Sequence, residues 1–147
     1  GNDLTVIGSH GFSVVSDMFA DDIDYNSINL LVLPGGVPGI NNLDSYVGLD
    51  SLLNHCVFNS IPIGAICAAP SLLAKRGILS GHKAVCYPGF EKSFGINTEF
   101  CSHDRVVKSG FIITACAASA SAEFGFSLAS FFVSDEVISD VKSKLLI

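Results

Sequence analysis

The residue with the clearest chemical potential in this sequence is Cys67, which ends the apolar run of residues 61–66 and is followed by Pro70. Proline suits the first turn of a helix, so a strand should turn into a helix at this cysteine, as in a nucleophile elbow. A thiol placed there faces the positive end of the helix dipole and free N–H groups, which favour the nucleophilic thiolate. Packing of Cys67 as a small hydrophobe at a strand end is an equally weighted alternative.

A second signal is the turn Pro34-Gly35-Gly36, which ends the preceding apolar run of residues 28–33. Two glycines let the backbone turn sharply and approach a neighbouring site. If the two runs form adjacent strands, the N–H groups of Gly36 and Ala68 flank the Cys67 sulfur. Two such donors stabilise the oxyanion formed when a thiolate attacks a carbonyl, by about 3 kcal/mol per donor. An ordinary glycine turn is the alternative.

The other four cysteines are assigned from their contexts. Cys86 directly precedes Tyr87 on a predicted strand that should border the same crevice, which makes it a candidate resolving thiol after oxidation of Cys67. Plain core packing is the favoured alternative for Cys86. The remaining three occur in apolar helical or strand contexts and are predicted to be structural, namely Cys56, Cys101 and Cys116.

Neither a metal nor a cofactor is predicted. The four histidines show no metal-ligand spacing, and the cysteines form no CxxC pair. His103 is the histidine that we would test as a neighbour of Cys67. Glu91 and Glu123 are expected in solvation or dimer contacts, although Glu91 could approach the thiol.

The elements that must position these residues follow from the apolar pattern. Strands are predicted at residues 4–7, 12–16, 28–33, 61–66, 83–86, 105–108 and 111–115, and helices at residues 44–59, 71–76, 121–133 and 134–146. Residues 4–7 with 12–16, and 105–108 with 111–115, are predicted hairpins. Alternating strands and helices favour an α/β fold with a mostly parallel sheet and helices on both faces. In such sheets, ligands bind where the carboxyl ends of the strands open a crevice.

Composition narrows the class of protein. The 147 residues suit one domain, residues 1–147, and 49% of them are hydrophobic, with a mean hydropathy of +0.52. No apolar run is long enough to span a membrane, and no export signal is visible, so a cytoplasmic location is predicted. An odd count of five cysteines favours free thiols in a reducing compartment. A net charge of −6 without a basic stripe makes nucleic acid an unlikely partner.

Four motifs then connect the chain to a known family. They are Val32-Leu33-Pro34-Gly35-Gly36, Ala65-Ile66-Cys67-Ala68-Ala69-Pro70, Cys86-Tyr87-Pro88-Gly89-Phe90-Glu91 and Ser121-Ala122-Glu123-Phe124. In this order they resemble the ThiJ/PfpI superfamily, which has the class I glutamine amidotransferase-like fold. The closest likeness is to the branch with the parkinsonism-associated deglycase and bacterial proteins labelled as thiazole-monophosphate synthesis proteins or protease I. The resemblance runs from about residue 4 to the C-terminus.

The resemblance implies a flavodoxin-like three-layer sandwich that is commonly dimeric. It further implies that Cys67 is the nucleophilic, oxidation-sensitive cysteine and that Gly36 and Ala68 supply the oxyanion donors. Family members carry a strand, a helix and a strand of about forty residues before the region that matches the start of this chain. That segment supplies the acidic residue that hydrogen-bonds the cysteine and moves protons.

Two further departures from the family pattern bear on the chemistry. Several members carry a histidine where Tyr87 stands, and a phenol is a poor base at neutral pH. Many relatives have a Gly-Pro-Gly turn where this chain has Ala117-Ala118-Ser119, so the pocket and its substrate preference should differ. Pocket neighbours are therefore predicted to be Gly35, Cys86, Tyr87, Ala118 and Ser119.

The leading functional hypothesis is a glyoxalase- or deglycase-like enzyme in which the Cys67 thiolate adds to small reactive carbonyls. The alternative is a redox-sensing or chaperone-like protein that uses reversible oxidation of Cys67 under oxidative stress. A peptidase or amidotransferase-like hydrolase ranks third, because the histidine that such enzymes need is replaced by Tyr87.

Overall fold

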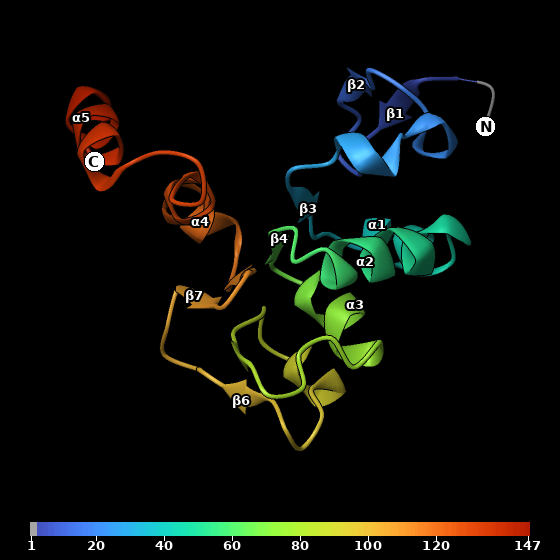
Figure 1. The fold of residues 1–147 in the computed structure, drawn as a ribbon. Helices are drawn as coiled ribbons and strands as arrows, with labels where there is room; N and C mark the ends of the chain where they lie inside the picture. The colour runs from blue at the N-terminus through green and yellow to red at the C-terminus, as the bar shows by residue number, and fades with distance from the viewer. Residues whose placement is uncertain (1–2) are drawn as a thin grey trace.

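A four-stranded sheet forms the centre of the computed structural model, which describes residues 3–147 (Figure 1). Its strands lie in the order β3 (Leu31–Leu33), β4 (Ile63–Ile66), β8 (Ile112–Ala115) and β7 (Val106–Ser109). The first three strands run parallel, and β7 runs antiparallel to β8. The prediction of a mostly parallel sheet is therefore confirmed.

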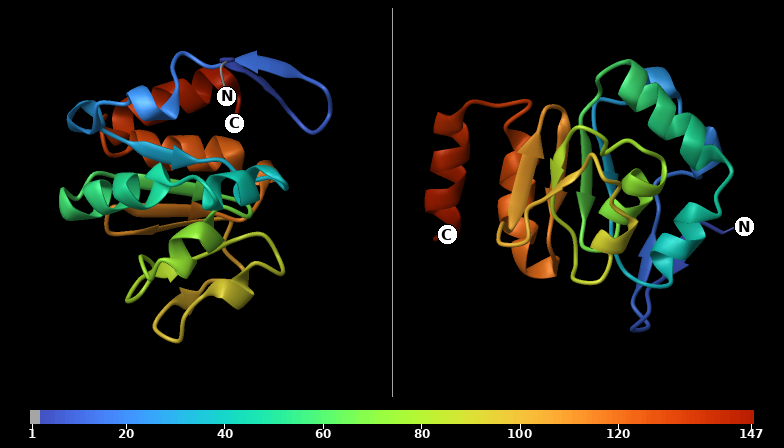
Figure 2. Two further views of the ribbon diagram at one scale, coloured as in Figure 1. Left: turned by 90° about the vertical axis from the view of Figure 1, so that its right-hand side faces the viewer. Right: turned by 90° about the horizontal axis from the view of Figure 1, so that it is seen from below.

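Helices cover both faces of this sheet and give three layers (Figure 1). The helices α1 (Gly39–Asp44), α2 (Gly48–Phe58) and α3 (Pro70–Lys75) pack on one face, and α4 (Ser121–Ala129) packs on the other. The last helix, α5 (Asp135–Leu145), lies beyond α4 at the edge of the molecule (Figure 2). This layering is that of a flavodoxin-like sandwich, so the predicted fold class is confirmed.

The alternation of side chains along β4 decides which residues meet which helices. Ile63 and Ala65 are fully buried in the cluster formed with α1, α2 and α3. Gly64 faces the other way, toward α4. A Cβ atom at Gly64 would lie only 2.8 Å from side-chain atoms of both Phe124 and Leu128. The missing side chain thus lets α4 pack directly against the strand that leads to Cys67.

Both predicted hairpins are present. β1 (Thr5–Ile7) pairs antiparallel with β2 (Ser13–Val15), and β7 joins β8 through Gly110 at a φ of +63°. Every residue of β1 and β2 is exposed, and their hairpin projects away from the central sheet (Figure 2).

Two predicted elements differ from the structure. The predicted helix 44–59 begins four residues later, as α2, and the short helix α1 before it was not predicted. Ser45 ends α1 with its hydroxyl donating to the Asn41 carbonyl at 2.9 Å. The predicted strand 83–86 is reduced to β5 (Lys83–Ala84), which pairs in parallel with β6 (Glu99–Phe100) in a separate two-stranded sheet. Short 3-10 turns complete the chain at Ala20–Asp22, Tyr25–Ser27, Glu91–Ser93 and Ala118–Ala120.

Within residues 3–147, no helix has both the length and the apolar character needed to cross a membrane. The same residues contain no cluster of three or more His, Cys, Asp or Glu side chains that could hold a metal ion.

Candidate functional site

Cys67 follows β4 directly and has a left-handed backbone conformation, with a φ of +64°. This conformation costs a residue other than glycine about 1–2 kcal/mol, and such residues gather at functional sites. The Cys67 N–H donates to the Ala115 carbonyl at 2.8 Å, which ties the turn to the end of β8. Cys67 is partly exposed, whereas the three residues that follow it are buried. The predicted strand, sharp turn and helix therefore meet beneath an accessible cysteine.

The Gly35-Gly36 turn lies directly against this elbow. β3 and β4 are adjacent parallel strands, with Leu33 opposite Ala65, so the segments that follow them emerge side by side. A Cβ atom at Gly35 would lie 2.7 Å from the Cys67 Cβ, 2.8 Å from the Ile66 carbonyl oxygen and 3.1 Å from the Ala68 nitrogen. Gly36 follows at a φ of +95°, a conformation that favours glycine. The close approach of the two turns therefore requires glycine at position 35, and the backbone conformation favours it at position 36.

Two backbone donors remain free in the two turns that meet here. Neither the Gly36 N–H nor the Ala68 N–H donates to an acceptor in the part of the chain that the structure describes. The Ala68 carbonyl is engaged, because it accepts from the buried Ser71 hydroxyl at 2.7 Å. Free N–H groups held in rigid turns beside a nucleophile are the arrangement that can receive an oxyanion.

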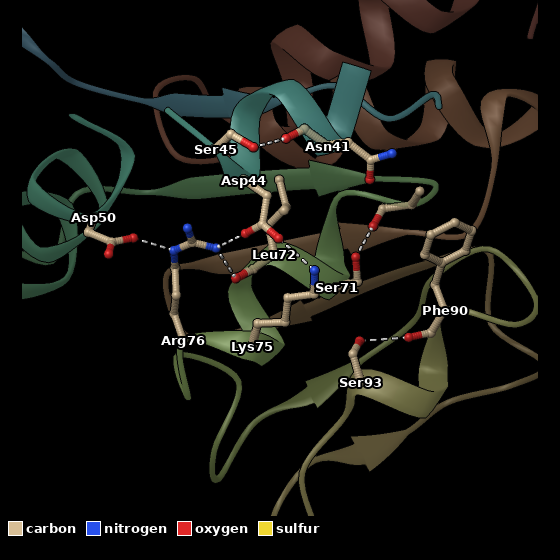
Figure 3. A network of polar contacts seen from close by, with 11 residues as sticks. Asn41, Asp44, Ser45, Asp50, Ser71, Leu72, Lys75, Arg76, Phe90 and Ser93 are labelled. Atoms are coloured by element: carbon tan, nitrogen blue, oxygen red, sulfur yellow. Dashed lines mark hydrogen bonds and ion pairs between the residues drawn. The ribbon is translucent and has the colours of Figure 1, made fainter. Parts of the chain in front are cut away.

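A network of ion pairs joins the helices that follow the two turns, α1 after Gly36 and α3 after Cys67 (Figure 3). Asp44, at the end of α1, accepts from Lys75 at 2.6 Å and from Arg76 at 2.8 Å. Arg76 also contacts Asp50 of α2 at 2.5 Å. Hydrogen bonds from Lys75 and then Arg76 hold the pKa of Asp44 below its ordinary value. The network therefore fixes α1 relative to α3, and with it the two turns that carry the free donors.

A third segment, residues 84–87, closes the site from another direction. The Tyr87 N–H donates to the Cys67 carbonyl at 2.8 Å. Two residues earlier, the Val85 N–H donates to the hydroxyl of Thr114, a fully buried residue of β8, at 2.9 Å. These two bonds hold Cys86 between the end of β8 and the elbow.

Cys86 itself is almost completely buried, with 2% of its surface exposed. Its pKa is raised to about 12, chiefly by burial and further by the negative charges of Glu91 and Cys67. Cys86 is therefore a neutral thiol at neutral pH.

A cavity of about 550 Å³ opens beside Cys86 and Tyr87. Its walls include Glu91, His103 and Cys116. Glu91 accepts from the Gly89 N–H at 2.5 Å, which keeps its carboxylate near the cavity. The cavity can hold a small organic molecule next to the segment that hydrogen-bonds Cys67.

The turn at Ala117-Ala118-Ser119 lies beside this cavity. Ala117 lines the cavity, whereas Ala118 and Ser119 are exposed at the start of the last 3-10 turn. Arg105 holds this turn, because it donates to the Ser119 carbonyl and pairs with Glu123 at 2.8 Å. The carboxylate of Glu123 is thus used in an ion pair on the surface.

The remaining cysteines and histidines are distributed over other parts of the fold. Cys56 is buried in α2, and burial raises its pKa, while Cys101 follows β6. His82 contacts Ser109, and His55 stacks near Tyr25.

Two positioning residues were not singled out from the sequence, Thr114 and Ser71. Each is a buried polar residue in an apolar segment, and each hydrogen-bonds the backbone that shapes the site. Buried hydroxyls nearly always have partners, so a threonine inside the apolar run of residues 111–115 is the signal that could have found Thr114.

Comparisons of the sequence and of the structure with known proteins agree with one another. Residues 2–130 match the DJ-1/PfpI family. Protein DJ-1 homolog B of Arabidopsis thaliana is 32% identical over 92% of this chain, and a deglycase of Pyrococcus horikoshii is 33% identical over 59% of it. This chain spans 31% of the Arabidopsis protein's length and 52% of the deglycase's. The crystal structure of Drosophila melanogaster DJ-1beta superposes with a TM-score of 0.90 at 29% identity, covering 97% of this chain and 77% of that one.

Proposed function

Because this chain belongs to the DJ-1/PfpI family, we propose that it is a cysteine-dependent enzyme that acts on small reactive carbonyls through Cys67. The observation that carries the proposal is the pair of free N–H groups, on Gly36 and Ala68, beside a partly exposed cysteine at a strained elbow. The name of the Pyrococcus horikoshii relative, a deglycase, supports the same class of chemistry.

In the proposed reaction, the Cys67 thiolate attacks an aldehyde carbon and the carbonyl π electrons move onto oxygen. The resulting alkoxide is stabilised by the N–H groups of Gly36 and Ala68, each of which is worth about 3 kcal/mol in comparable sites. These donors cost no rearrangement during the reaction, since the turns that carry them are already fixed by the glycine contact and by the ion pairs of Asp44. A proton taken up from water converts this alkoxide to a hemithioacetal, whose further conversion decides the product.

Methylglyoxal turnover by the purified protein is the direct test. The variant Cys67→Ser should lose turnover by at least about 100-fold, because a serine hydroxyl is un-ionised at neutral pH. Cys101→Ser is the matched control, since this cysteine lies after β6 and away from the elbow, and it should retain turnover. Equal turnover in the Cys67→Ser variant and the wild type would end the proposal.

A redox-sensing role is the second candidate, and differences among the cysteines favour it. Burial raises the pKa values of Cys56 and Cys86, whereas Cys67 is partly exposed beside free N–H donors. We therefore expect mild peroxide to oxidise Cys67 first, which mass spectrometry would measure. Oxidation of all five cysteines at similar rates would remove the basis of this role. A peptidase role ranks lower, because Tyr87 offers no imidazole at the elbow.

We also propose that the protein is a cytoplasmic homodimer, as the family resemblance implies. The hairpin of β1 and β2 exposes apolar side chains, including Val6, Phe12 and Val14, which suits a contact with a second copy. Sedimentation velocity on the wild type and on Phe12→Ser measures this directly. A monomeric wild-type protein at micromolar concentration would rule the dimer out.

A further inference from the structure

We infer that Cys86 is the resolving thiol of Cys67: after a peroxide converts Cys67 to a sulfenic acid, Cys86 forms a reversible disulfide with it. The inference rests on the reactivity proposed for Cys67. It adds a second residue to the site, a defined oxidised product and a means of regulation.

A backbone hydrogen bond brings the segments that carry the two cysteines together. The Tyr87 N–H donates to the Cys67 carbonyl at 2.8 Å, and Cys86 immediately precedes that N–H. Only one peptide unit separates each Cα atom from this hydrogen bond, so the Cα atoms of Cys67 and Cys86 lie less than about 8 Å apart. Disulfides join Cα atoms separated by about 4.4–6.8 Å, a range that lies within this limit.

The surroundings of the two thiols give them different roles. Cys67 is partly exposed and can meet a peroxide, whereas Cys86 is 2% exposed and is shielded from one. Burial, the charge of Glu91 and the charge of Cys67 together raise the pKa of Cys86. Oxidation of Cys67 to the neutral sulfenic acid removes the last of these three effects. It also places an electrophilic sulfur beside the thiol, where proximity favours reaction over any external thiol.

The two steps balance with peroxide as the only oxidant. The Cys67 thiolate attacks one peroxide oxygen, the O–O bond breaks, and Cys67 sulfenic acid and hydroxide are formed. The Cys86 sulfur then attacks the Cys67 sulfur, the S–O bond breaks, and the hydroxyl leaves with the Cys86 proton as water. A cellular dithiol returns two electrons and two protons and restores both thiols.

Cys116 is the competing partner, because it lines the same cavity as Cys86 and follows Ala115, whose carbonyl binds the Cys67 N–H. Each of the two cysteines adjoins a residue that bonds the Cys67 backbone, but Cys86 is packed in the interior at 2% exposure, whereas Cys116 is partly exposed. The experiment therefore has to separate Cys86 from Cys116.

The test treats the wild-type protein with one equivalent of hydrogen peroxide, blocks free thiols under denaturing conditions and maps peptides by mass spectrometry. Trypsin leaves Cys56 and Cys67 on one peptide, because the first lysine or arginine is Lys75, so chymotrypsin is added to cleave between them after Phe58. We expect a cross-linked Cys67–Cys86 peptide about 2 Da lighter than the sum of its reduced parts. Dithiothreitol should restore both thiols completely.

Variants at Cys86 and Cys116 show which of the two cysteines reacts with oxidised Cys67. In Cys86→Ser, or in Cys86→Ala if the serine variant is poorly folded, the cross-link should vanish and Cys67 should advance to the sulfinic acid, about 32 Da heavier, which dithiothreitol does not reverse. Cys116→Ser is the matched control and should form the same cross-link as the wild type.

Three outcomes would overturn the inference. In the first, Cys67 of the wild type becomes a sulfinic acid while Cys86 stays reduced. In the second, Cys67 is cross-linked to Cys116 and not to Cys86. In the third, Cys67 does not react with peroxide. Methylglyoxal turnover is measured in parallel. Turnover without the cross-link removes this inference alone, and the cross-link without turnover removes only the proposed enzyme function.

Discussion

Gly35 lies so close to Cys67 that a Cβ atom on the glycine would be 2.7 Å from the Cβ of the cysteine. The two residues belong to different turns, one after β3 and the other after β4. Real Cβ atoms do not approach each other this closely, so the packing of the two turns depends on glycine at this position. Cys67 and the turn that carries the free Gly36 N–H are therefore brought together by the absence of one side chain.

Gly35→Ala should consequently impair the site strongly. The added methyl group would meet the Cys67 Cβ and the Ile66 carbonyl oxygen, and neither is the end of a flexible side chain that can swing away. Overpacking of this kind typically lowers the free energy of unfolding by about 1–3 kcal/mol, and we expect a loss in this range for Gly35→Ala. Because the turns must separate, carbonyl turnover should fall by at least about tenfold. Urea denaturation and methylglyoxal kinetics measure the two effects.

Gly95→Ala is the control for that change, since Gly95 lies in a surface loop, has no left-handed φ and leaves open space within 4 Å of the point where the new methyl group would sit. It should alter stability by less than about 0.5 kcal/mol and leave turnover unchanged. If Gly35→Ala behaved like Gly95→Ala, the contact between the two turns would not be what positions the cysteine.

Thr114→Val should loosen the segment that carries Cys86 and Tyr87. Valine keeps the shape of threonine but removes the acceptor of the Val85 N–H, which would then be buried without a partner. Leaving such a group unpaired costs about 1–3 kcal/mol in the free energy of unfolding. Thermal unfolding should show the loss, and formation of the Cys67–Cys86 cross-link should slow with it.

Thr114→Ser provides the matching rescue, because it retains the hydroxyl and loses only a methyl group. It should recover most of the cross-linking rate. A valine variant as stable as the wild type, with unchanged cross-linking, would contradict the positioning role of Thr114.

The relation between the two turns could be predicted from the sequence because each follows a continuous apolar run. Such runs are typical of buried parallel strands, and the helical pattern between them indicates a crossover that brings their carboxyl ends together. The glycines and Cys67 then fall at the same edge of the sheet. Local pattern and overall topology agree in this part of the chain, which is why the prediction holds.

The sequence places Cys86 on a strand near the crevice, but the contacts that fix it could not be predicted in the same way. Its segment has only two residues of regular strand, β5, and its place is set by single hydrogen bonds to Thr114 and Cys67, far away in the sequence. Bonds of this kind leave no periodic pattern. The same applies to α1, a six-residue helix that was not predicted and that ends with the Ser45 hydroxyl donating to the Asn41 carbonyl.

The ion pairs around Asp44 lead to a prediction about pH. Its folded-state pKa is lowered by Lys75 and Arg76, so ionised Asp44 stabilises the fold at pH values above its unfolded pKa of about 3.9. That contribution is lost as the pH falls through the lowered folded value. Asp44→Asn should therefore destabilise the protein by about 1 kcal/mol at pH 7. The difference from the wild type should shrink below about pH 4.

Asp140→Asn separates this network from an ordinary surface pair. Asp140 pairs with Lys144 on α5, where both side chains are more than half exposed, so its loss should cost no more than about 0.5 kcal/mol. Asp44→Asn should additionally lower carbonyl turnover several-fold, because it frees α1 from α3 and lets the Gly36 N–H move relative to the Ala68 N–H. Denaturation from pH 3 to 7 and kinetics at pH 7 test both parts. Turnover that is unchanged while stability falls would show that the network supports the fold without holding the two donors in place.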